Sequence, residues 1–138
     1  EHKILLVTGG GRGIGAATAL LAAERGYAVA VNYLRRSDEA EAAVNKVRNR
    51  GGRAIAVQAD VSSEKDVARM FKTVDRELGP VTALVNNAGT LELQSPIENM
   101  DAARLRRVFE TNVIGSFLCA REAVRRMSTD VGARVAAS

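Results

Sequence analysis

The chain has 138 residues, of which 46% are apolar and 26% are charged, and its formal net charge is +4. A chain of this length corresponds to about one domain with a core of its own, and every apolar run is far shorter than the ~20 residues of a membrane-spanning helix. No signal-peptide pattern opens the sequence. These features predict one domain, residues 1–138, in a cytoplasmic protein without a membrane partner.

The cysteine and histidine content argues against metal and thiol chemistry. The sequence has one cysteine, Cys119, and one histidine, His2. One cysteine cannot form an internal disulfide, and the two residues together cannot supply the four ligands of a structural zinc site. We therefore predict no metal site.

The excess of positive charge is dispersed along the chain. Arginines occur in every predicted helix and alternate with aspartate and glutamate, which favours solvated helix faces. A basic protein that binds nucleic acid would retain DNA in a strongly salt-dependent way, but it would need the charge gathered on one surface. We therefore predict no nucleic-acid partner.

Apolar segments of strand length alternate with helical segments along the whole chain. The predicted strands are residues 3–8, 27–33, 53–61, 81–89 and 133–138. The predicted helices are residues 14–25, 37–50, 62–78 and 101–127, the last as one long helix or two in succession. This alternation implies right-handed crossovers and parallel strands. The predicted fold class is α/β, a Rossmann-type doubly wound parallel sheet with five strands in this chain.

The helix boundaries carry recognisable end signals. Ser37 and Asp38 lie where a side-chain cap would begin the second helix, and two glycines follow its end. The third predicted helix begins with Ser62 and stops at Gly79 and Pro80.

A glycine-rich turn joins the first predicted strand to the first helix, in the segment VTGGGRGIGAATA. At this junction a doubly wound sheet presents bare backbone N–H groups and the positive end of a helix dipole, which suit a diphosphate. Glycine is required because a Cβ would hold the chain away from the phosphates and would clash between helix and strand. An ordinary tight turn is the alternative reading of the glycines alone.

Four motifs occur in order along the chain. The segment TGGGRGIG at residues 8–15 has the spacing T-G-x-x-x-G-x-G, and it is followed by DV at 60–61, NNAG at 86–89 and TNV at 111–113. This series resembles the short-chain dehydrogenase/reductase family over essentially the whole chain, and within it the 3-oxoacyl-carrier-protein reductases and the glucose 1-dehydrogenases. The resemblance implies an oxidoreductase that transfers a hydride between a nicotinamide cofactor and a small-molecule carbonyl or alcohol.

One set of residues is assigned to the cofactor by this resemblance and by the rule that ligands bind beyond the carboxyl ends of parallel strands. In the family the DV segment contacts adenine and the NNAG segment lines the cofactor cleft. Helix capping is the alternative role for Asp60, and a simple turn is the alternative for NNAG. The assigned residues are Gly9, Gly11, Arg12, Gly13, Ile14, Gly15, Asn32, Tyr33, Arg35, Asp60, Val61, Asn87, Ala88 and Gly89.

The charge near the second strand favours NADP(H), with NAD as the alternative. An enzyme that prefers NAD places an acidic residue at the end of this strand to bind the ribose 2′-hydroxyl, but here the position carries Asn32. Arg12, Arg35 and Arg36 surround the place where a 2′-phosphate would lie. Simple solvation of Arg35 and Arg36 remains the other reading.

The catalytic residues of the family are only partly present. In the family a tyrosine exchanges the proton, and a lysine four residues later lowers the tyrosine pKa. The sequence contains only Tyr27 and Tyr33, and the residues four positions later are Val31 and Ser37, so no Tyr-x-x-x-Lys occurs. The simplest explanation is an N-terminal portion of such an enzyme. The alternative is a non-catalytic dinucleotide-binding module.

Two catalytic positions are nevertheless assigned. Asn112 matches the asparagine that supports a proton-relay water in the family, and a surface or kink-forming asparagine is the alternative reading. Ser138 ends the segment that resembles the family's fifth strand, so it is assigned as the serine that orients the carbonyl, or as its neighbour.

The long helix carries apolar residues on more than one face. We expect one stripe to cover the sheet and the remaining residues to meet another subunit, so that the protein forms a homodimer or homotetramer. A thick core within one chain is the alternative. The stripe comprises Leu105, Val108, Val113, Phe117, Ala120, Val124 and Met127. The other apolar residues are Phe109, Ile114, Leu118 and Cys119.

Overall fold

The structure is a computed structural model that describes residues 3–11, 13–88 and 101–127. Its described strands form one parallel sheet in the order β3-β2-β1-β4. The strands are β1 (Ile4–Val7), β2 (Ala28–Tyr33), β3 (Ala54–Gln58) and β4 (Ala83–Val85). The predicted α/β fold with a doubly wound parallel sheet is confirmed. The predicted fifth strand lies outside the described residues.

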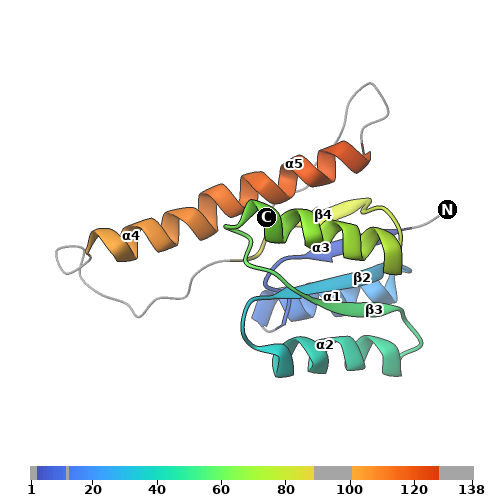
Figure 1. Cartoon of the computed structure of the whole chain (residues 1–138). Coiled ribbons are helices and arrows are strands. Elements are labelled where there is room, and N and C mark those ends of the chain that lie inside the picture. The colour runs from blue at the N-terminus through green and yellow to red at the C-terminus, as the bar shows by residue number, and fades with distance from the viewer. Residues whose placement is uncertain (1–2, 12, 89–100, 128–138) are drawn as a thin grey trace.

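Helices cover both faces of the sheet (Figure 1). On one face lie α1 (Gly13–Glu24) and α2 (Ser37–Asn49), and on the other lie α3 (Glu64–Glu77) and α5 (Gly115–Met127). Between α3 and α5 the chain passes through α4 (Ala102–Phe109) and a π-helical turn, η2 (Glu110–Ile114). Figure 1 shows α4 continuing the line of α5 beyond the edge of the sheet.

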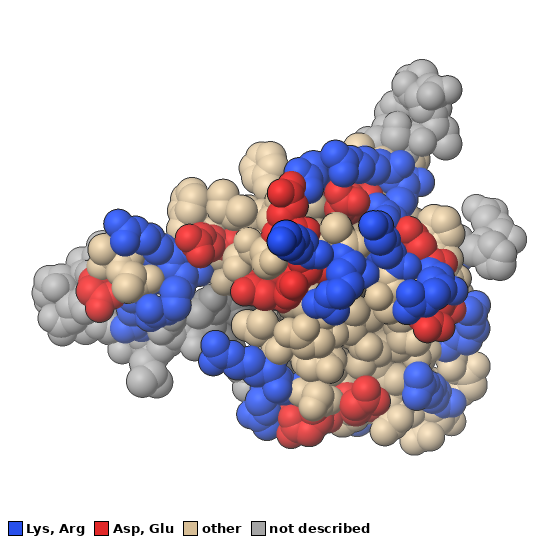
Figure 2. Space-filling view, viewed as in Figure 1, with Lys and Arg blue, Asp and Glu red and all other residues tan. Residues whose placement is uncertain are grey.

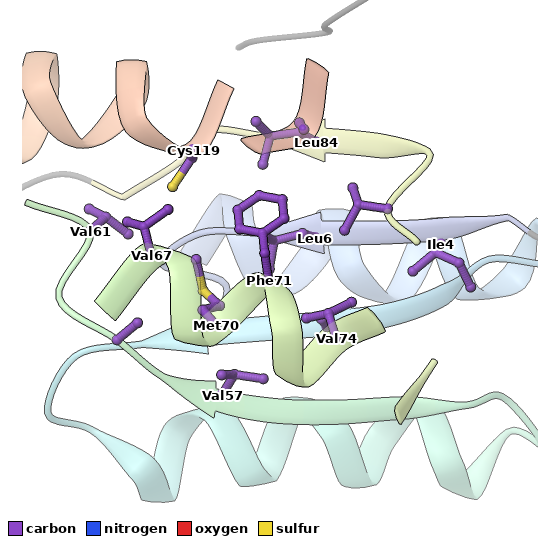
Figure 3. Close-up of a cluster of buried hydrophobic side chains, with 14 of the residues drawn as sticks. Ile4, Leu6, Val57, Val61, Val67, Met70, Phe71, Val74, Leu84 and Cys119 are labelled. Atoms are coloured by element: carbon purple, nitrogen blue, oxygen red, sulfur yellow. The ribbon is translucent and has the colours of Figure 1, made fainter. Parts of the chain in front are cut away.

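The apolar core is divided by the sheet into two layers, because successive strand residues point to opposite faces. In β1, Ile4 and Leu6 join the layer beneath α3 and α5, whereas Leu5 and Val7 join the layer beneath α1 and α2. Figure 3 shows the first layer, in which Phe71 of α3 is surrounded by strand and helix side chains. Coverage on both faces explains why the strands are continuous apolar runs.

The strands are shorter than the apolar runs predicted. β3 ends at Gln58, and β4 contains only three residues, Ala83–Val85. Beyond the strands the chain forms loops at the carboxyl edge of the sheet. These loops contain the DV and NNAG motifs, so the motifs lie beyond the strands rather than within them.

The helix caps differ from those expected. Ser37 is the first helical residue of α2 and does not cap it, because the N-cap position is occupied by Arg36 without a side-chain hydrogen bond. In α3 the N-cap is Ser63, whose side chain accepts a hydrogen bond from the Asp66 backbone N–H.

The predicted apolar stripe on the long helix is wrong at Val113 and Phe117, which are 40% and 75% exposed, whereas Cys119 is fully buried. The physical reason is the π-helical turn: the Gly115 N–H donates to the Glu110 carbonyl, five residues back, which rotates α5 relative to α4. Gly115 also lies so close to the chain after β3 that a Cβ there would be 2.7 Å from Val61 Cγ2. Burial raises the pKa of Cys119 to about 12, which keeps its thiol protonated.

An ion-pair network fastens α5 to α3. Arg126 donates to both carboxylate oxygens of Asp75 and to Glu122 Oε1, each at 3.0 Å, and its guanidinium lies 4.9 Å from the Phe71 ring centre. Arg125 adds a 2.7 Å bond to Glu122. Burial alone would raise the pKa of the Glu122 carboxyl, but the hydrogen bond from Arg126 and the neighbouring positive charges outweigh it and lower that pKa.

No helix in the described part of the chain is both long and apolar enough to cross a membrane. The cytoplasmic location expected from composition stays a prediction. Basic and acidic side chains alternate over the face viewed in Figure 2, in agreement with the dispersed charge of the sequence.

We predict that Glu122→Gln lowers the free energy of unfolding by about 1–2 kcal/mol at pH 7, because Arg126, which is largely removed from water, loses the charge of a buried partner. Since the Glu122 pKa is lowered on folding, its contribution is present at neutral pH and is lost as the pH falls through the folded pKa. Denaturant titrations at pH 7 and at acid pH measure both effects. Glu64→Gln, at an exposed carboxylate that pairs with Arg121, is the control and should change stability much less. A pH-independent effect of Glu122→Gln would contradict this assignment.

Candidate functional site

A cleft of about 980 Å³ lies at the carboxyl edge of the sheet, within the volume range of ligand pockets. Loops that follow all four described strands contribute to it, together with residues of α4 and η2. This is the edge where ligands bind in open α/β sheets, and the order β3-β2-β1-β4 places the switch point between β1 and β4.

Most residues that the sequence assigned to the cofactor line this one cleft, although they come from four separate segments. They are Gly9, Gly11, Gly13, Ile14, Asn32, Tyr33, Arg35, Asp60, Val61, Asn87 and Ala88. Gly15 is buried behind the lining. Arg12 and Gly89 lie outside the described residues.

The glycine loop is built from close backbone contacts. Gly9 has a φ of +62°, and a Cβ on it would lie 3.0 Å from Ala88 Cα. A Cβ on Gly15 would lie 2.7 Å from the Gly9 carbonyl oxygen and 2.6 Å from Asn87 Nδ2. The two distances at Gly15 are too short for any residue with a Cβ, so its glycine lets the start of α1 pack directly on the loop. At Gly9 the positive φ disfavours other residues. Gly9, Gly11 and Gly13 therefore present bare backbone to the cleft.

Thr8 connects the ends of β1 and β4. Its hydroxyl oxygen accepts hydrogen bonds from the backbone N–H groups of Asn87 (2.9 Å) and Ala88 (3.0 Å), and its side chain is buried. The Asn87 side chain in turn donates a hydrogen bond to the Gly9 carbonyl at 3.1 Å. These bonds hold the NNAG segment against the glycine loop. In the sequence Thr8 is only the first residue of the glycine motif, and nothing in the motif spacing predicts this role.

Asn32 lies at the end of β2, in contact with both neighbouring loops. Its Oδ1 accepts from the Gly9 N–H at 3.2 Å, and its Nδ2 lies 3.3 Å from the Val57 carbonyl and 3.2 Å from the Ala59 carbonyl. The residue is only 2% exposed. Its amide is thus engaged with backbone on both sides.

The two arginines after β2 have different surroundings. Arg36 forms a two-bond pair with Asp38, at 3.2 and 3.1 Å, and a salt bridge with Glu39 at 3.3 Å. The Asp38 hydrogen bond is the main cause that raises the pKa of Arg36. Arg35 also lines the cleft and is exposed, and the structure shows no hydrogen bond or ion pair for its side chain within residues 3–11, 13–88 and 101–127.

Asp60 organises its own loop. Its Oδ1 accepts from the Ser62 N–H at 2.9 Å and from the Ser62 hydroxyl at 2.6 Å, and its backbone N–H donates to Asp66 Oδ2. The N-cap of α3 is Ser63, so the capping alternative for Asp60 is wrong. Asp60 instead shapes the turn that precedes the cap, at the wall of the cleft.

Asn112 lies in the π-helical turn, and its side chain is exposed. Its carbonyl oxygen accepts from the Ser116 hydroxyl at 2.8 Å. Turns of this kind are frequent at functional sites, and the preceding residues Glu110 and Thr111 line the cleft. Ser138 lies outside the described residues.

Several lining residues were missed by sequence reasoning. Leu34 follows the second strand, and Arg107, Glu110 and Thr111 approach from α4 and η2. Only the TNV motif, which begins at Thr111, pointed to this region, since no strand-end rule covers residues that a helix brings to the cleft.

A family model described as short chain dehydrogenase matches residues 3–137. The chain belongs to this family. The uncharacterised oxidoreductase YgfF of Escherichia coli is 52% identical over 129 residues, covering 94% of this chain and 52% of the relative. A cis-4-hydroxycyclohexanecarboxylate dehydrogenase of Sinomonas cyclohexanicum is 40% identical over 127 residues, covering 92% of this chain and 50% of that protein.

Solved structures of the short-chain dehydrogenase family have the same fold. A variant of a Serratia marcescens short-chain dehydrogenase/reductase superposes with a TM-score of 0.88 at 35% identity, covering 98% of this chain and 54% of that one. The chain thus spans about half the length of these relatives. The family resemblance found in the sequence is confirmed. The narrower resemblance to 3-oxoacyl-carrier-protein reductases and glucose 1-dehydrogenases stays a prediction.

We predict that Thr8→Val lowers the free energy of unfolding by about 2 kcal/mol, because the partly buried N–H groups of Asn87 and Ala88 lose their acceptor. Thermal and denaturant unfolding measure the loss. Thr18→Val is the matched control, since the Thr18 hydroxyl only donates to a carbonyl of its own helix, and it should be nearly neutral. Equal effects of the two substitutions would contradict the role given to Thr8.

Proposed function

We propose that the chain binds NADP(H) in the cleft as part of an enzyme that transfers a hydride between the cofactor and the carbonyl or alcohol carbon of a small molecule. One observation carries this proposal: the loops after all four described strands line a single cleft. The loop after β1 is rich in glycine, and at Gly15 it has no space for a Cβ. Membership of the short-chain dehydrogenase family and relatives named as oxidoreductase and dehydrogenase support it.

The glycine loop fits the diphosphate of a dinucleotide. It stands at the N-terminus of α1, where backbone N–H groups without helical partners and the helix dipole favour an anion. The positions at which a Cβ would collide with backbone, Gly9 and Gly15, are those that let α1 and the NNAG loop approach the loop closely. A larger side chain at either position would push these segments apart and disrupt the diphosphate site.

The adenosine end of the cofactor is proposed to lie over the segments after β2 and β3. Tyr33 and Leu34 after β2, and Asp60 and Val61 after β3, line this part of the cleft. Of the two arginines that follow β2, we propose that Arg35 binds the 2′-phosphate, because the guanidinium of Arg36 is paired with Asp38 and Glu39. The part assigned to Arg12 rests on the sequence alone.

The nicotinamide, when bound, supplies or accepts the hydride, while the protein positions it and handles the proton. Asn112 is proposed to support the proton relay from the π-helical turn, and Ser138 to orient the substrate carbonyl. Since the 138 residues contain no Tyr-x-x-x-Lys, a non-catalytic dinucleotide-binding module is the second candidate. NADPH oxidation by the purified protein with a panel of carbonyl compounds separates the two: binding without turnover across the panel favours the module.

We predict that Arg35→Gln weakens NADPH binding about tenfold and leaves NADH binding nearly unchanged, because only NADPH carries the 2′-phosphate that the guanidinium would pair with. Titration calorimetry with each dinucleotide measures the two dissociation constants. Arg53→Gln, at an exposed arginine outside the cleft lining, is the matched control and should affect neither. Equal losses for both dinucleotides in Arg35→Gln would contradict a 2′-phosphate contact.

We further propose a homodimer or homotetramer formed through the long helix. Phe109, Val113, Ile114 and Phe117 are exposed along α4, η2 and α5, at 56%, 40%, 40% and 75%. Neighbouring apolar residues exposed on one helical segment indicate a protein–protein contact surface.

Phe117→Glu is expected to shift the protein to a smaller oligomer, because a charge would be buried in the contact. Sedimentation velocity measures the change in mass. Leu21→Glu places the same charge at a 48% exposed leucine of α1, on the opposite side of the sheet, and should leave the assembly intact. An unchanged mass for Phe117→Glu would refute the proposed contact.

A further inference from the structure

Asn32 lies between the glycine loop and the segment that follows β3. It is the second-to-last residue of β2, between β1 and β3 in the sheet, and only 2% of its surface is exposed. The glycine loop leaves the sheet on one side of it, and the segment carrying Asp60 leaves on the other. A buried polar side chain in this place must find its hydrogen-bond partners within the protein.

Both ends of the Asn32 amide are used. Oδ1 accepts from the Gly9 N–H at 3.2 Å, and Nδ2 lies within 3.4 Å of the Val57, Ala59 and Tyr33 carbonyls. The backbone carbonyl of Asn32 also accepts from the Gly10 N–H at 3.1 Å. One residue therefore holds the first two amides of the glycine loop and joins them to the end of β3.

This arrangement decides which loop amides are left for a ligand. Since Gly9 and Gly10 donate their N–H groups to Asn32, an anion in the loop must be bound by amides further along, from Gly11 toward the start of α1. The N–H groups of Gly9 and Gly10 thus point toward Asn32, and the N–H groups that follow them remain for the phosphates.

The chemistry of this position requires an amide. Asparagine offers an acceptor to Gly9 and donors to the carbonyls beyond β3. An ionised aspartate could accept from Gly9, but its second oxygen would face the Val57 and Ala59 carbonyls, which are also acceptors. The acidic residue that binds a ribose hydroxyl in NAD-preferring enzymes is therefore incompatible with the hydrogen bonds found at this position.

We infer that Asn32 is a positioning residue for the diphosphate-binding loop and does not contact the cofactor ribose. Discrimination at the 2′ position falls to the residues that follow it, from Tyr33 to Arg35. This inference rests on the proposed function, because it concerns the same cleft, and it replaces the cofactor-binding role that the sequence alone assigned to Asn32.

The decisive comparison is Asn32→Asp against Asn45→Asp, which makes the same chemical change at an exposed position of α2. Dissociation constants are measured for NADPH, NADH and 2′-AMP, which has the adenine and 2′-phosphate but no diphosphate. We expect Asn32→Asp to weaken NADPH and NADH by the same factor, about tenfold or more, with 2′-AMP nearly unchanged. Asn45→Asp should match the unsubstituted protein with all three ligands.

Each other result has a distinct meaning. A gain of NADH over NADPH in Asn32→Asp would show that residue 32 contacts the ribose and would overturn the inference. Wild-type-like binding of both dinucleotides by Asn32→Asp would overturn it as well. If the unsubstituted protein binds neither dinucleotide, the proposed function itself fails. Equal loss of 2′-AMP and the dinucleotides would show general damage to the cleft and would refute a role specific to the diphosphate loop.

A second measurement applies even if Asn32→Asp does not fold. Hydrogen–deuterium exchange of the unsubstituted, ligand-free protein should show that the peptide containing Gly9 and Gly10 is already protected, because both amides are bonded to Asn32. Free exchange of these amides, with protection appearing only when a dinucleotide is added, would overturn the inference.

Discussion

The close approach of bare backbone at the end of β1 is the constraint on which the site depends. The glycine loop must pass against the NNAG loop and beneath the start of α1 at distances that leave no room for a Cβ at Gly9 or Gly15. Because most of its residues are glycines, this loop has few side chains to hold it in one conformation. Its position is set instead by side chains at or just beyond the strand ends around it: Thr8, Asn32 and Asn87.

These three polar residues have the same location and the same kind of hydrogen bonding. Each is largely removed from water at the end or just beyond the end of a strand, where the ladder of backbone hydrogen bonds stops and unpaired N–H and C=O groups begin. Threonine and asparagine can donate and accept at once, so each can bridge two loops. The result is a cleft whose walls are joined before any ligand arrives, which reduces the ordering that binding would require.

The far wall of the cleft depends on a different feature. The π-helical turn at Glu110–Ile114 changes the rotation of the long helix, and the close contact of Gly115 with Val61 sets its depth on the sheet. The same rotation buries Cys119 and exposes Phe117. One extra residue in a helical turn thus affects both the residues that reach the cleft and the apolar surface left for another subunit.

The sequence by itself determined the alternation of strands and helices, the carboxyl-edge location of the motifs and the family, because these depend on apolar periodicity and on glycine spacing, which are local properties. It did not determine the strand ends, the α2 cap, the exposed face of the long helix or the direction of the Asn32 side chain. Those features depend on contacts between residues far apart in the chain: Asn32 with Gly9 and Val57, Gly115 with Val61. Only the tertiary structure decided them, because a side chain that can donate and accept equally well has no preferred partner until the fold brings specific backbone groups beside it.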